Sequence, residues 1–289
     1  MKKFFIYAAI AALVIPFVSC NNKIDYGNGP QAKIEKAKYS DYAKKVTIKS
    51  GEAKDNGIQE IEFTDGGRYI ITAIKAKANE DVQIKTGTYT FKDGVYTLDD
   101  GSTISFDSNG NFTLIFKQDG KDVTVTGTYE QQPKISATDF SRDIAHTWKI
   151  SKIDISVVAQ GKNVGVVKDG SNIEQIGKDL IEQAKTMGAD VNIDTDKLKG
   201  YNVKTITFTS SHTLFIEFTE APTFKASVNS ISGYNFKYKL EVGVENDILN
   251  AEAECKFEPQ SANTAWLTAK VKGEGFDGRV IFYLTVAED

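Results

Sequence analysis

Histidine is almost missing from this chain of 289 residues, and its scarcity excludes most metal and nucleophilic chemistry. The chain has two histidines, His146 and His212, and neither has a second His or Cys at the spacing of a zinc site. The chain also lacks a Gly-x-Ser-x-Gly elbow, a phosphate loop and a dinucleotide fingerprint. We therefore expect both histidines to be surface or packing residues, and we predict no catalytic residue, no metal site, no cofactor and no enzymatic activity.

Cysteine is equally rare, and the two cysteines have different settings. Cys20 lies near the N-terminus, and Cys255 lies in the alternating stretch 251–257, on the same side as Phe257. If Cys20 carries a lipid, Cys255 has no partner for an intramolecular disulfide. A catalytic cysteine needs a histidine and an electropositive setting, and the sequence around Cys255 supplies neither. We expect a buried, inert thiol on the apolar face of a strand.

Basic runs and proline-rich segments are also absent. No stretch of five or six basic residues occurs, and the formal net charge of -4 becomes -6 when Lys2 and Lys3 leave with a signal peptide. Nucleic-acid binding requires Lys and Arg to neutralise phosphates, and adhesion to anionic lipid requires similar clusters. We therefore predict no nucleic-acid partner. The composition, with 40% hydrophobic and 26% charged residues, is that of a globular protein.

The first twenty residues have the pattern of an export signal. Two lysines are followed by an uncharged apolar run over residues 4–18. This run is shorter than the roughly 20 residues that cross a bilayer as a helix, so it is typical of a signal peptide. It ends in Phe17-Val18-Ser19-Cys20.

That ending resembles the lipobox of bacterial lipoproteins, in which a small residue precedes the cysteine that is lipidated after cleavage. Phe17 stands where the family usually has Leu. The resemblance implies a signal peptide over residues 1–19 and lipidation, typically with palmitate, at Cys20. Each buried methylene contributes ~0.8 kcal/mol, so two or more acyl chains hold a protein stably to a membrane. An ordinary secretory signal is the alternative. Residues 20–39 are polar and suit a flexible tether.

Short strand-like runs dominate the first half of the mature chain. They alternate apolar with polar residues or are rich in β-branched and aromatic residues. Turn signals such as Asp93-Gly94 and Asp119-Gly120 separate them at roughly ten-residue spacing. This pattern is typical of antiparallel hairpins in a sandwich or barrel. The predicted strands are 46–48, 58–63, 69–74, 87–91, 95–98, 104–106, 112–116 and 123–129.

A repeat is visible among these hairpins. Residues 61–69 align with residues 104–112, and each copy is followed by Gly-Thr-Tyr, at 87–89 and 127–129. A third copy of the first element occurs at 206–214. Each copy predicts a hairpin whose apolar residues at alternate positions face one interior. The repeat therefore indicates a meander of reused hairpins.

The strand pattern breaks at residues 131–133 and restarts at residue 147. We therefore place an N-terminal β-domain at residues 40–133 and a C-terminal β-domain at residues 141–289. Strands in the second domain are predicted at 148–158, 203–208, 214–218, 234–244, 251–257, 265–271 and 279–286.

One helix is predicted in the second domain, over residues 171–187. Ser171 and Glu174 form a capping box at its start, and Gly188 is placed as its C-terminal cap. A short helix needs tertiary packing, so we expect it to lie across an open end or a flank of the domain. A fixed plug that completes the core is favoured over a mobile lid. The residues expected to face inward are Ile173, Ile176, Leu180, Ala184 and Met187.

Two other features favour packing or solvation over a ligand site. The acidic run over residues 190–196 starts like a calcium loop, but Thr195 stands where glycine is needed and Tyr201 where glutamate is needed. We expect a wetted strand face there. Trp148 is expected to be a core plug at one end of a barrel, and stacking on a sugar or apolar ligand is the alternative.

Several of these features together resemble a known family. The features are an opening Thr-Trp-Lys strand at 147–149, an inserted helical segment, Ile-x-Phe-Thr hairpins and Gly-Thr-Tyr strands. Over residues 141–289, and through the hairpins of 40–131, they resemble the lipocalin-like domains of Bacteroidetes lipoproteins. The resemblance implies up-and-down barrels of about eight strands and supplies no functional residues. The predicted fold is mainly β, with two antiparallel lipocalin-like β-barrel or meander domains, the second with one inserted α-helix.

The leading functional prediction is a lipid-anchored lipoprotein of the cell envelope, at the outer membrane, that binds or scaffolds without chemistry. The acyl chains on Cys20 would reach the membrane, and the unknown ligand is expected to be a small apolar molecule or a glycan. An envelope hydrolase acting on glycans is one alternative, because 39 acidic residues guarantee carboxylate pairs in space. A surface-assembly subunit of the pilus type, which would need a donated strand, is the other.

Overall fold

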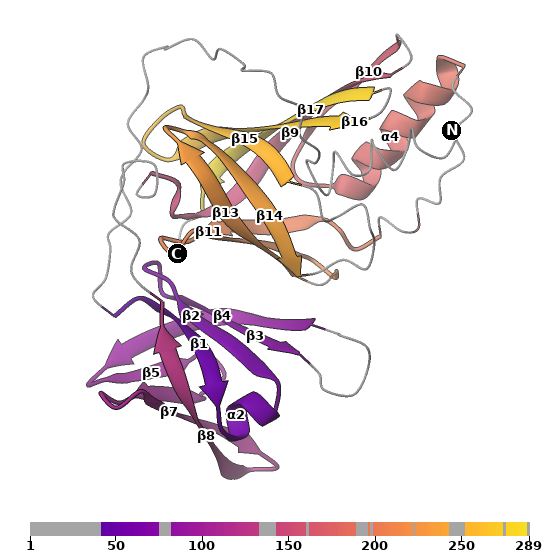
Figure 1. Ribbon diagram of the computed structural model, residues 1–289. Helices are drawn as coiled ribbons and strands as arrows, with labels where there is room; N and C mark the ends of the chain where they lie inside the picture. The colour runs from indigo at the N-terminus through magenta and orange to yellow at the C-terminus, as the bar shows by residue number, and fades with distance from the viewer. Residues whose placement is uncertain are drawn as a thin grey trace. The chain divides into compact units, whose positions relative to one another are not determined.

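The computed structural model consists of two compact β-units (Figure 1). It describes residues 42–74, 82–132, 143–159, 162–188, 196, 199–221, 223–242, 252–273 and 276–287. The predicted signal peptide, Cys20 and the tether lie outside these residues. None of the helices in the described part of the chain combines the length and apolar character that a membrane crossing requires.

The first unit is a closed antiparallel barrel of eight strands. Each strand pairs with the next, and β8 pairs with β1 to complete the ring. A helical turn that the sequence pattern does not predict, α2 (Glu52–Asp55), follows β1 and buries Ala53 in the barrel core. The strands are β1 (Lys44–Ser50), β2 (Ile58–Phe63), β3 (Arg68–Ile74), β4 (Val82–Lys92), β5 (Val95–Leu98), β6 (Thr103–Phe106), β7 (Asn111–Gln118) and β8 (Lys121–Gln131).

The Asp-Gly turn signals adopt the conformation that two-residue hairpins require. Asp93 and Gly94, between β4 and β5, have φ angles of 52° and 84°. Asp119 and Gly120, between β7 and β8, have φ angles of 52° and 76°. Two consecutive positive φ angles are typical of the type I′ turn, whose twist matches that of the flanking strands. These turns explain why the strand boundaries on either side are readable from sequence.

Aromatic side chains fill the interior of the first barrel. The rings of Phe63 and Tyr96 are stacked with their centroids 3.8 Å apart, and those of Phe106 and Tyr129 are 4.8 Å apart. An eight-stranded barrel has room for its own side chains or for one small ligand, and here its own rings occupy that room. The buried cluster comprises Val46, Ile48, Ala53, Ile61, Phe63, Tyr69, Ile71, Tyr89, Tyr96, Leu98, Ile104, Phe112, Leu114 and Val125.

The Gly-Thr-Tyr repeat is a hydrogen-bonded unit that joins each hairpin to the strand beside it. The backbone N–H of Tyr89 donates to the carbonyl of Gly67 at 2.8 Å, and its hydroxyl donates to the carbonyl of Thr64 at 2.6 Å. In the second copy, the N–H of Tyr129 donates to the carbonyl of Gly110 at 2.8 Å, and its hydroxyl donates to a turn carbonyl at 3.0 Å. The repeat in the sequence is therefore a repeat of one local bonding pattern.

Glycine begins this unit because an aromatic ring of the hairpin lies against it. A Cβ on Gly87 would lie 2.7 Å from Cε1 of Tyr69, and a Cβ on Gly127 would lie 2.7 Å from Cε1 of Phe112. Contacts this short leave no room for a side chain. Glycine at these two positions is therefore required by packing.

The third copy keeps the hydrogen bond without the glycine. The carbonyl of His212 accepts from the N–H of Val228 at 2.7 Å, and His212 has a positive φ of 59°. Ala226 stands opposite Leu214, in the register that pairs Gly87 with an aromatic residue in the first copy. Because leucine replaces the ring, the facing position accepts a methyl group.

The second unit is also a closed antiparallel barrel, with one strand outside the ring. Strands β9 and β11–β17 close the ring through the pairing of β17 with β9, and β10 adds to β9. The prediction of a mainly β chain with two antiparallel barrels, the second with an inserted helix, is confirmed. The strands are β9 (Thr147–Ala159), β10 (Lys162–Asp169), β11 (Val203–Phe208), β12 (Thr213–Phe218), β13 (Phe224–Ser232), β14 (Asn235–Val242), β15 (Glu252–Pro259), β16 (Thr264–Gly273) and β17 (Phe276–Val286).

A bulge in β9 lies where the strand that pairs with one of its edges changes from β11 to β10. The first residues, Thr147 and Trp148, pair with β11, whereas the stretch from Lys152 onward pairs with β10. Ser151 is skipped in the register with β17, and its carbonyl accepts from the N–H of Gly170 at 2.6 Å. Bulges bend a strand and increase its twist. Here the bulge marks the point where β10 replaces β11 as the neighbour of β9.

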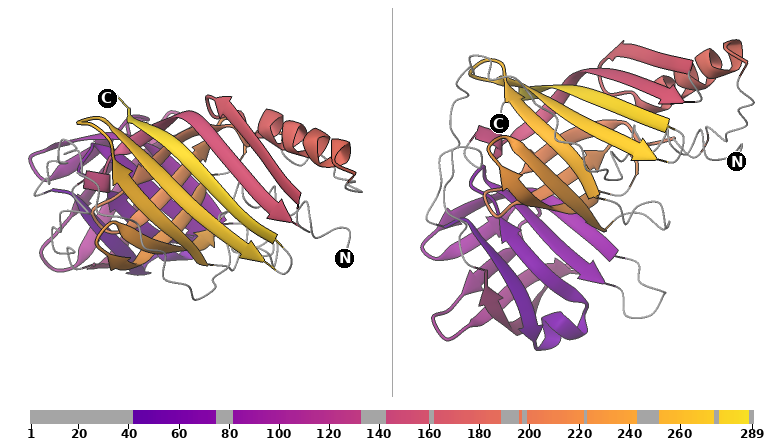
Figure 2. Two further views of the ribbon diagram at one scale, coloured as in Figure 1. Left: turned by 90° about the horizontal axis from the view of Figure 1, so that it is seen from above. Right: turned by 45° about the horizontal axis from the view of Figure 1, so that its top comes forward.

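Helix α4 (Ile173–Thr186) connects β10 to β11 and lies beside β10 (Figures 1 and 2). Two contacts fix it along that strand. The side chain of Gln183 accepts from the N–H of Gly165 at 3.3 Å, and Asp179 pairs with Lys168 at 2.8 Å. The helix flanks the barrel wall, and its apolar residues belong to the same buried cluster as those of β9 and β10.

The predicted capping box is wrong. Asn172 is the N-cap, and its side chain accepts from the N–H of Gln175 at 2.9 Å. Ser171 lies one residue before the cap, where its carbonyl accepts from the N–H of Val203 at the start of β11. Asn caps helices as well as Ser does, so Asn172 fills the role that the sequence pattern gave to Ser171. Glu174 pairs with the next turn of the helix instead of reaching back.

The C-terminal cap and most of the inward face agree with the sequence pattern. Gly188 has a φ of 77°, and its N–H donates to the carbonyl of Lys185 at 2.9 Å. The prediction that Met187 faces inward is wrong, because its side chain is 41% exposed. It lies one turn beyond Gln183, which already contacts β10 near the first residue of that strand. The buried helix residues are Ile173, Ile176, Gly177, Leu180, Ile181 and Ala184.

Candidate functional site

Trp148 is a core residue. Its side chain is fully buried, and its indole Nε1 donates to the carbonyl of Ile144 at 2.9 Å. The ring contacts Phe257 at 5.5 Å and His146 at 5.4 Å between centroids. The expected core plug is confirmed, and stacking of Trp148 on a ligand is excluded.

Cys255 and the two histidines also lie in packing environments. Cys255 is buried beside Phe257 on the inner face of β15. Burial and the neighbouring Glu254 raise the pKa of its thiol, which keeps the sulfur protonated and unreactive. His146 packs on Trp148, and burial lowers the pKa of His212.

No group of three His, Cys, Asp or Glu side chains able to hold a metal ion occurs among the described residues. The acidic run proposed above as a solvated strand face covers residues 190–196. Of that run, the structure describes only Asp196.

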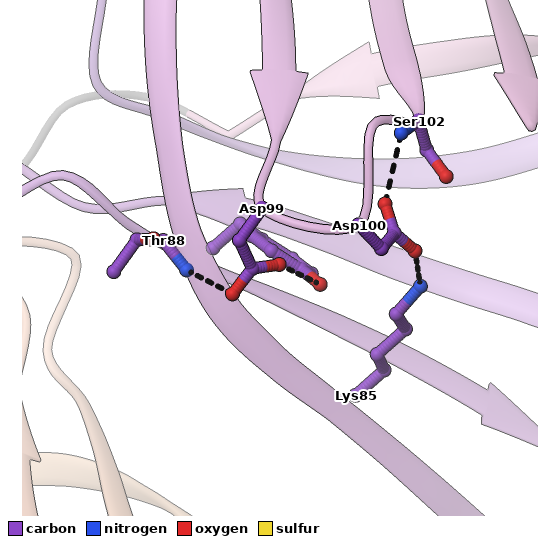
Figure 3. Close-up of polar contacts among 6 residues, drawn as sticks. Lys85, Thr88, Asp99, Asp100 and Ser102 are labelled. Atoms are coloured by element: carbon purple, nitrogen blue, oxygen red, sulfur yellow. Dashed lines mark hydrogen bonds and ion pairs between the residues drawn. The ribbon is translucent and has the colours of Figure 1, made fainter.

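Two adjacent carboxylates form a polar cluster on the first barrel (Figure 3). Asp99 and Asp100 lie in the turn between β5 and β6. Asp99 accepts from the N–H of Thr88 at 3.1 Å and from the hydroxyl of Tyr69 at 3.2 Å. Asp100 accepts from the N–H of Ser102 at 2.9 Å and pairs with Lys85 on β4. Every carboxylate oxygen of the pair therefore has a partner within the barrel.

The pKa values of this cluster indicate a structural role. Partial burial opposes the ionisation of Asp100, but its bonds from Lys85 and Ser102 outweigh burial and lower its pKa to about 2. Burial and the two carboxylates raise the pKa of Tyr69. A catalytic acid needs a pKa near the working pH, and neither Asp100 nor Tyr69 meets this requirement. The cluster fastens the turn between β5 and β6 to β4.

An outward-facing aromatic pair, with one exposed ring and one half-buried ring, lies on the outer wall of the second barrel. Trp266 on β16 and Tyr283 on β17 are cross-strand neighbours, with ring centroids 5.3 Å apart and an interplanar angle of 62°. Trp266 is 38% exposed. The residues on either side of it, Ala265 and Leu267, are buried in the core, so alternation directs the indole outward.

Charged residues continue this line across the neighbouring strands. Lys152 on β9 pairs with Tyr283, and its Nζ lies 4.7 Å from the ring centroid. Glu258 on β15 pairs with Trp266. We call Lys152, Tyr283, Trp266 and Glu258 the aromatic row. It presents two rings between an ammonium group and a carboxylate group.

A second aromatic pair, on the first barrel, has both rings exposed and extends that barrel's core. Tyr42 and Phe91 are stacked with centroids 5.1 Å apart. Phe91 also contacts Tyr96 at 4.6 Å, and the Tyr96 hydroxyl donates to the carbonyl of Tyr42 at 2.5 Å. These contacts continue directly into the aromatic interior, so this pair closes the barrel.

The sequence contained one signal for the aromatic row. The segment Ala265-Trp266-Leu267 alternates in a predicted strand and places tryptophan on the polar side. That signal identifies an outward tryptophan, but the row itself depends on the register of four strands.

No family model matches the chain, and no curated protein matches it. Similar solved structures include transferrin-binding protein B from Haemophilus parasuis, with 12% identity, 79% of this chain and 53% of that chain covered, and a TM-score of 0.27. The protein of that name from Neisseria meningitidis has 10% identity, 79% and 51% coverage and a TM-score of 0.27. A Nostoc punctiforme protein of unknown function has 9% identity, 85% and 94% coverage and a TM-score of 0.16.

The chain spans about half the length of the transferrin-binding proteins that it matches. At these identities and TM-scores, the similarity assigns no activity, ligand or partner to this chain.

Proposed function

We propose that this chain is a lipid-anchored protein of the cell envelope that binds a ligand on the outer wall of its second barrel, without catalysing a reaction. The apolar run and the Ser19-Cys20 ending support export and lipidation. The aromatic row carries the binding proposal, because it exposes Trp266 beside the half-buried Tyr283 on a barrel whose other aromatic residues largely face the core.

The packing of the interiors supports a ligand site on the outside. Rings occupy the first barrel, and in the second barrel Trp148, Phe224 and Phe257 are almost fully buried among aliphatic side chains. A small-molecule site is normally a concave pocket that encloses most of its ligand. The described core residues instead pack on one another, so a ligand inside either barrel would have to displace them.

Tryptophan and tyrosine are suited to such a surface. Each ring offers a large apolar face together with a polar group, and such residues dominate the energy of binding interfaces. A tryptophan left on the outside without a ligand exposes apolar area to water at an unfavourable free energy of ~25 cal/mol per Å². Covering Trp266 and Tyr283 with a ligand removes that area from water.

Oxidative footprinting of the full-length protein tests this proposal. The protein is exposed to hydroxyl radicals alone and with envelope fragments of the bacterium that carries it, and mass spectrometry measures modification of each aromatic residue. We expect the fragments to protect Trp266 and Tyr283. Phe91, which is exposed to a similar extent as Trp266, is the matched control and should stay reactive. Equal oxidation of Trp266 with and without fragments would contradict the proposal.

A further inference from the structure

We propose that Asn109 is a site of spontaneous chemical modification, at which the side-chain amide is lost as ammonia and the backbone of the turn is rearranged. Asn109 precedes Gly110 in the turn between β6 and β7. The reaction requires no ligand and no enzyme, and it changes the second copy of the hairpin repeat. It is supported by three features of the turn: the state of the Gly110 N–H group, the residue types found there in the other copies, and the bonds that Tyr129 makes to the turn.

The reaction takes place between two adjacent residues. The backbone nitrogen of Gly110 attacks Cγ of Asn109, a new N–Cγ bond forms, and the side-chain nitrogen leaves as ammonia with the proton that Gly110 gives up. Water then opens the resulting five-membered imide at one of its C–N bonds. Opening at Cγ gives aspartate, and opening at the main-chain carbonyl gives isoaspartate, in which the backbone runs through the side chain. Glycine favours the first step because it has no Cβ to obstruct the attack.

The structure describes two Asn-Gly pairs, and they differ in how firmly the attacking nitrogen is held. The N–H of Gly57 donates to the carbonyl of Lys54 at 2.9 Å, and Gly57 is buried. The N–H of Gly110 reaches the carbonyl of Asp107 at 3.5 Å, which is close to the upper limit for a hydrogen bond, and Asn109 is exposed. The nitrogen of Gly110 is therefore the more available nucleophile.

The other copies of the repeat show that this turn does not need asparagine. Gly66 occupies the corresponding position in the first copy, and Ser211 occupies it in the third. A left-handed residue follows this position in all three copies. The second copy alone places asparagine before a left-handed glycine, with a φ of 83° at Gly110. The turn therefore folds with other residue types at position 109, and these supply matched controls.

Isoaspartate at position 109 would disrupt the hydrogen bonds of the second Gly-Thr-Tyr unit. The carbonyls of Asp107 and Gly110 lie before and after that position, and they accept from the hydroxyl and the N–H of Tyr129 at 3.0 and 2.8 Å. Isoaspartate adds one backbone carbon between these two carbonyls, so they cannot both keep their places against Tyr129. We therefore expect the isoaspartate form to loosen β8 from the turn.

A turn too rigid to react is the competing explanation. The carboxylate of Asp107 accepts from the N–H groups of Asn109 and Asn111 at 2.8 Å each. The imide forms only if the Asn109 side chain swings over the nitrogen of Gly110. Rigidity predicts that folding protects Asn109 as well as it protects Asn56. The two explanations therefore differ in the reaction rate of the folded chain and agree for the unfolded chain, in which both pairs are accessible.

Mass spectrometry of the full-length protein measures the reaction at each pair. The protein is aged in mildly alkaline buffer, either folded or unfolded in guanidinium chloride, and is then digested with pepsin at low pH. In the folded protein we expect Asn109 to lose its amide faster than Asn56 by on the order of tenfold, because the N–H of Gly57 must first lose a hydrogen bond. In the unfolded protein we expect similar rates. If Asn109 reacts as slowly as Asn56 in the folded protein, the proposed modification site is wrong.

A matched variant tests the consequence for β8. Asn109→Ser introduces the residue type of the third copy and has no amide to lose, and Asn109→Gly, which follows the first copy, is a second control. We expect hydrogen exchange over residues 121–131 to be faster in the aged parent than in the fresh parent. Both variants should exchange alike before and after ageing. If the parent exchanges alike before and after most of Asn109 has reacted, the modified turn keeps its bonds and the expected loosening is refuted.

Discussion

Replacing Gly87 by alanine tests the packing that underlies the repeat in the first barrel. Gly87 begins the Gly-Thr-Tyr unit of β4 and faces Tyr69 across the strand pair. An added Cβ would lie 2.4 and 2.6 Å from the carboxylate oxygens of Asp99 and 2.7 Å from Cε1 of Tyr69. Cβ contacts this short do not occur without a shift of the neighbours, and both neighbours are already held by hydrogen bonds.

The expected loss in stability follows from those neighbours. Forcing a methyl group into a packed site costs ~1–3 kcal/mol. Moving Asp99 aside also breaks its bonds with the Tyr69 hydroxyl at 3.2 Å and the Thr88 N–H at 3.1 Å, each worth ~0.5–1.5 kcal/mol. We therefore expect Gly87→Ala to lower the free energy of unfolding of the first barrel by about 2–4 kcal/mol.

Hydrogen exchange of peptides from each barrel in the full-length protein measures this loss separately for the two units. Peptides from β3–β5 should exchange faster in Gly87→Ala. Both tryptophans lie in the second unit, so the urea transition followed by tryptophan fluorescence should not move. Gly66→Ala is the matched control, because a Cβ there meets nothing within 4 Å. If Gly87→Ala exchanges like Gly66→Ala, the proposed packing of the repeat is wrong.

Three further predictions follow from the structure. Leu180→Ala removes a buried side chain of α4 and should lower the free energy of unfolding, measured in urea, by ~2–4 kcal/mol. Met187→Ala should change that free energy little. Equal effects of the two substitutions would contradict the prediction that the helix is a fixed plug. The carboxyl of Asp100 should titrate near pH 2 by NMR. Because this folded pKa lies below the unfolded value of ~3.9, the stability it contributes is full above about pH 4 and is lost as the pH falls toward 2. Lys85→Met should move the titration upward, and an unchanged midpoint would refute the ion pair. Cys255 should resist thiol-modifying reagents until the second barrel unfolds, and rapid modification of the native protein would show that the thiol is not buried.

Most strands of the first barrel were predictable because strong turn chemistry bounds them on at least one side, whereas the start of β4 at Val82 has no such signal and was placed at residue 87. Asp93-Gly94 and Asp119-Gly120 adopt the positive φ angles that a two-residue hairpin turn needs. Because this requirement concerns only two adjacent residues, it can be recognised in the sequence. The repeat was visible for the same reason, since its bonds join a turn to the strand beside it. Its dependence on glycine could be recognised only when Tyr69 and Phe112 were seen against Gly87 and Gly127.

Strands β10 and β13 were missed because small or polar residues interrupt their β-branched residues. In β10, Gly165 interrupts the run of valines, and Val167 puts an apolar residue on the outward face, where it is 56% exposed. In β13, Ala226 and Ser227 have low β propensity. The pairing with β9 and with β12 supplies the stability that these sequences lack.

The candidate site was the least predictable part because it depends on register. Trp266, Tyr283, Lys152 and Glu258 lie in four strands that are separated in the sequence. A shift of one residue in any pairing would turn its side chain into the core. The capping of α4 was missed because Ser171 and Asn172 are adjacent and both residue types cap helices well, and Asn172 is the one whose side chain accepts from Gln175.

Metabolic labelling with palmitate tests the central claim most directly, because the proposed function requires a lipid anchor on Cys20. The parent chain and Cys20→Ser are expressed in a bacterium with the lipoprotein pathway, labelled, and separated into membrane and soluble fractions. We expect the parent to incorporate palmitate and to sediment with the membrane. Cys255 is buried, so Cys20→Ser should incorporate none and lose membrane attachment. Palmitate on Cys20→Ser, or an unlabelled parent chain, would contradict the lipid anchor.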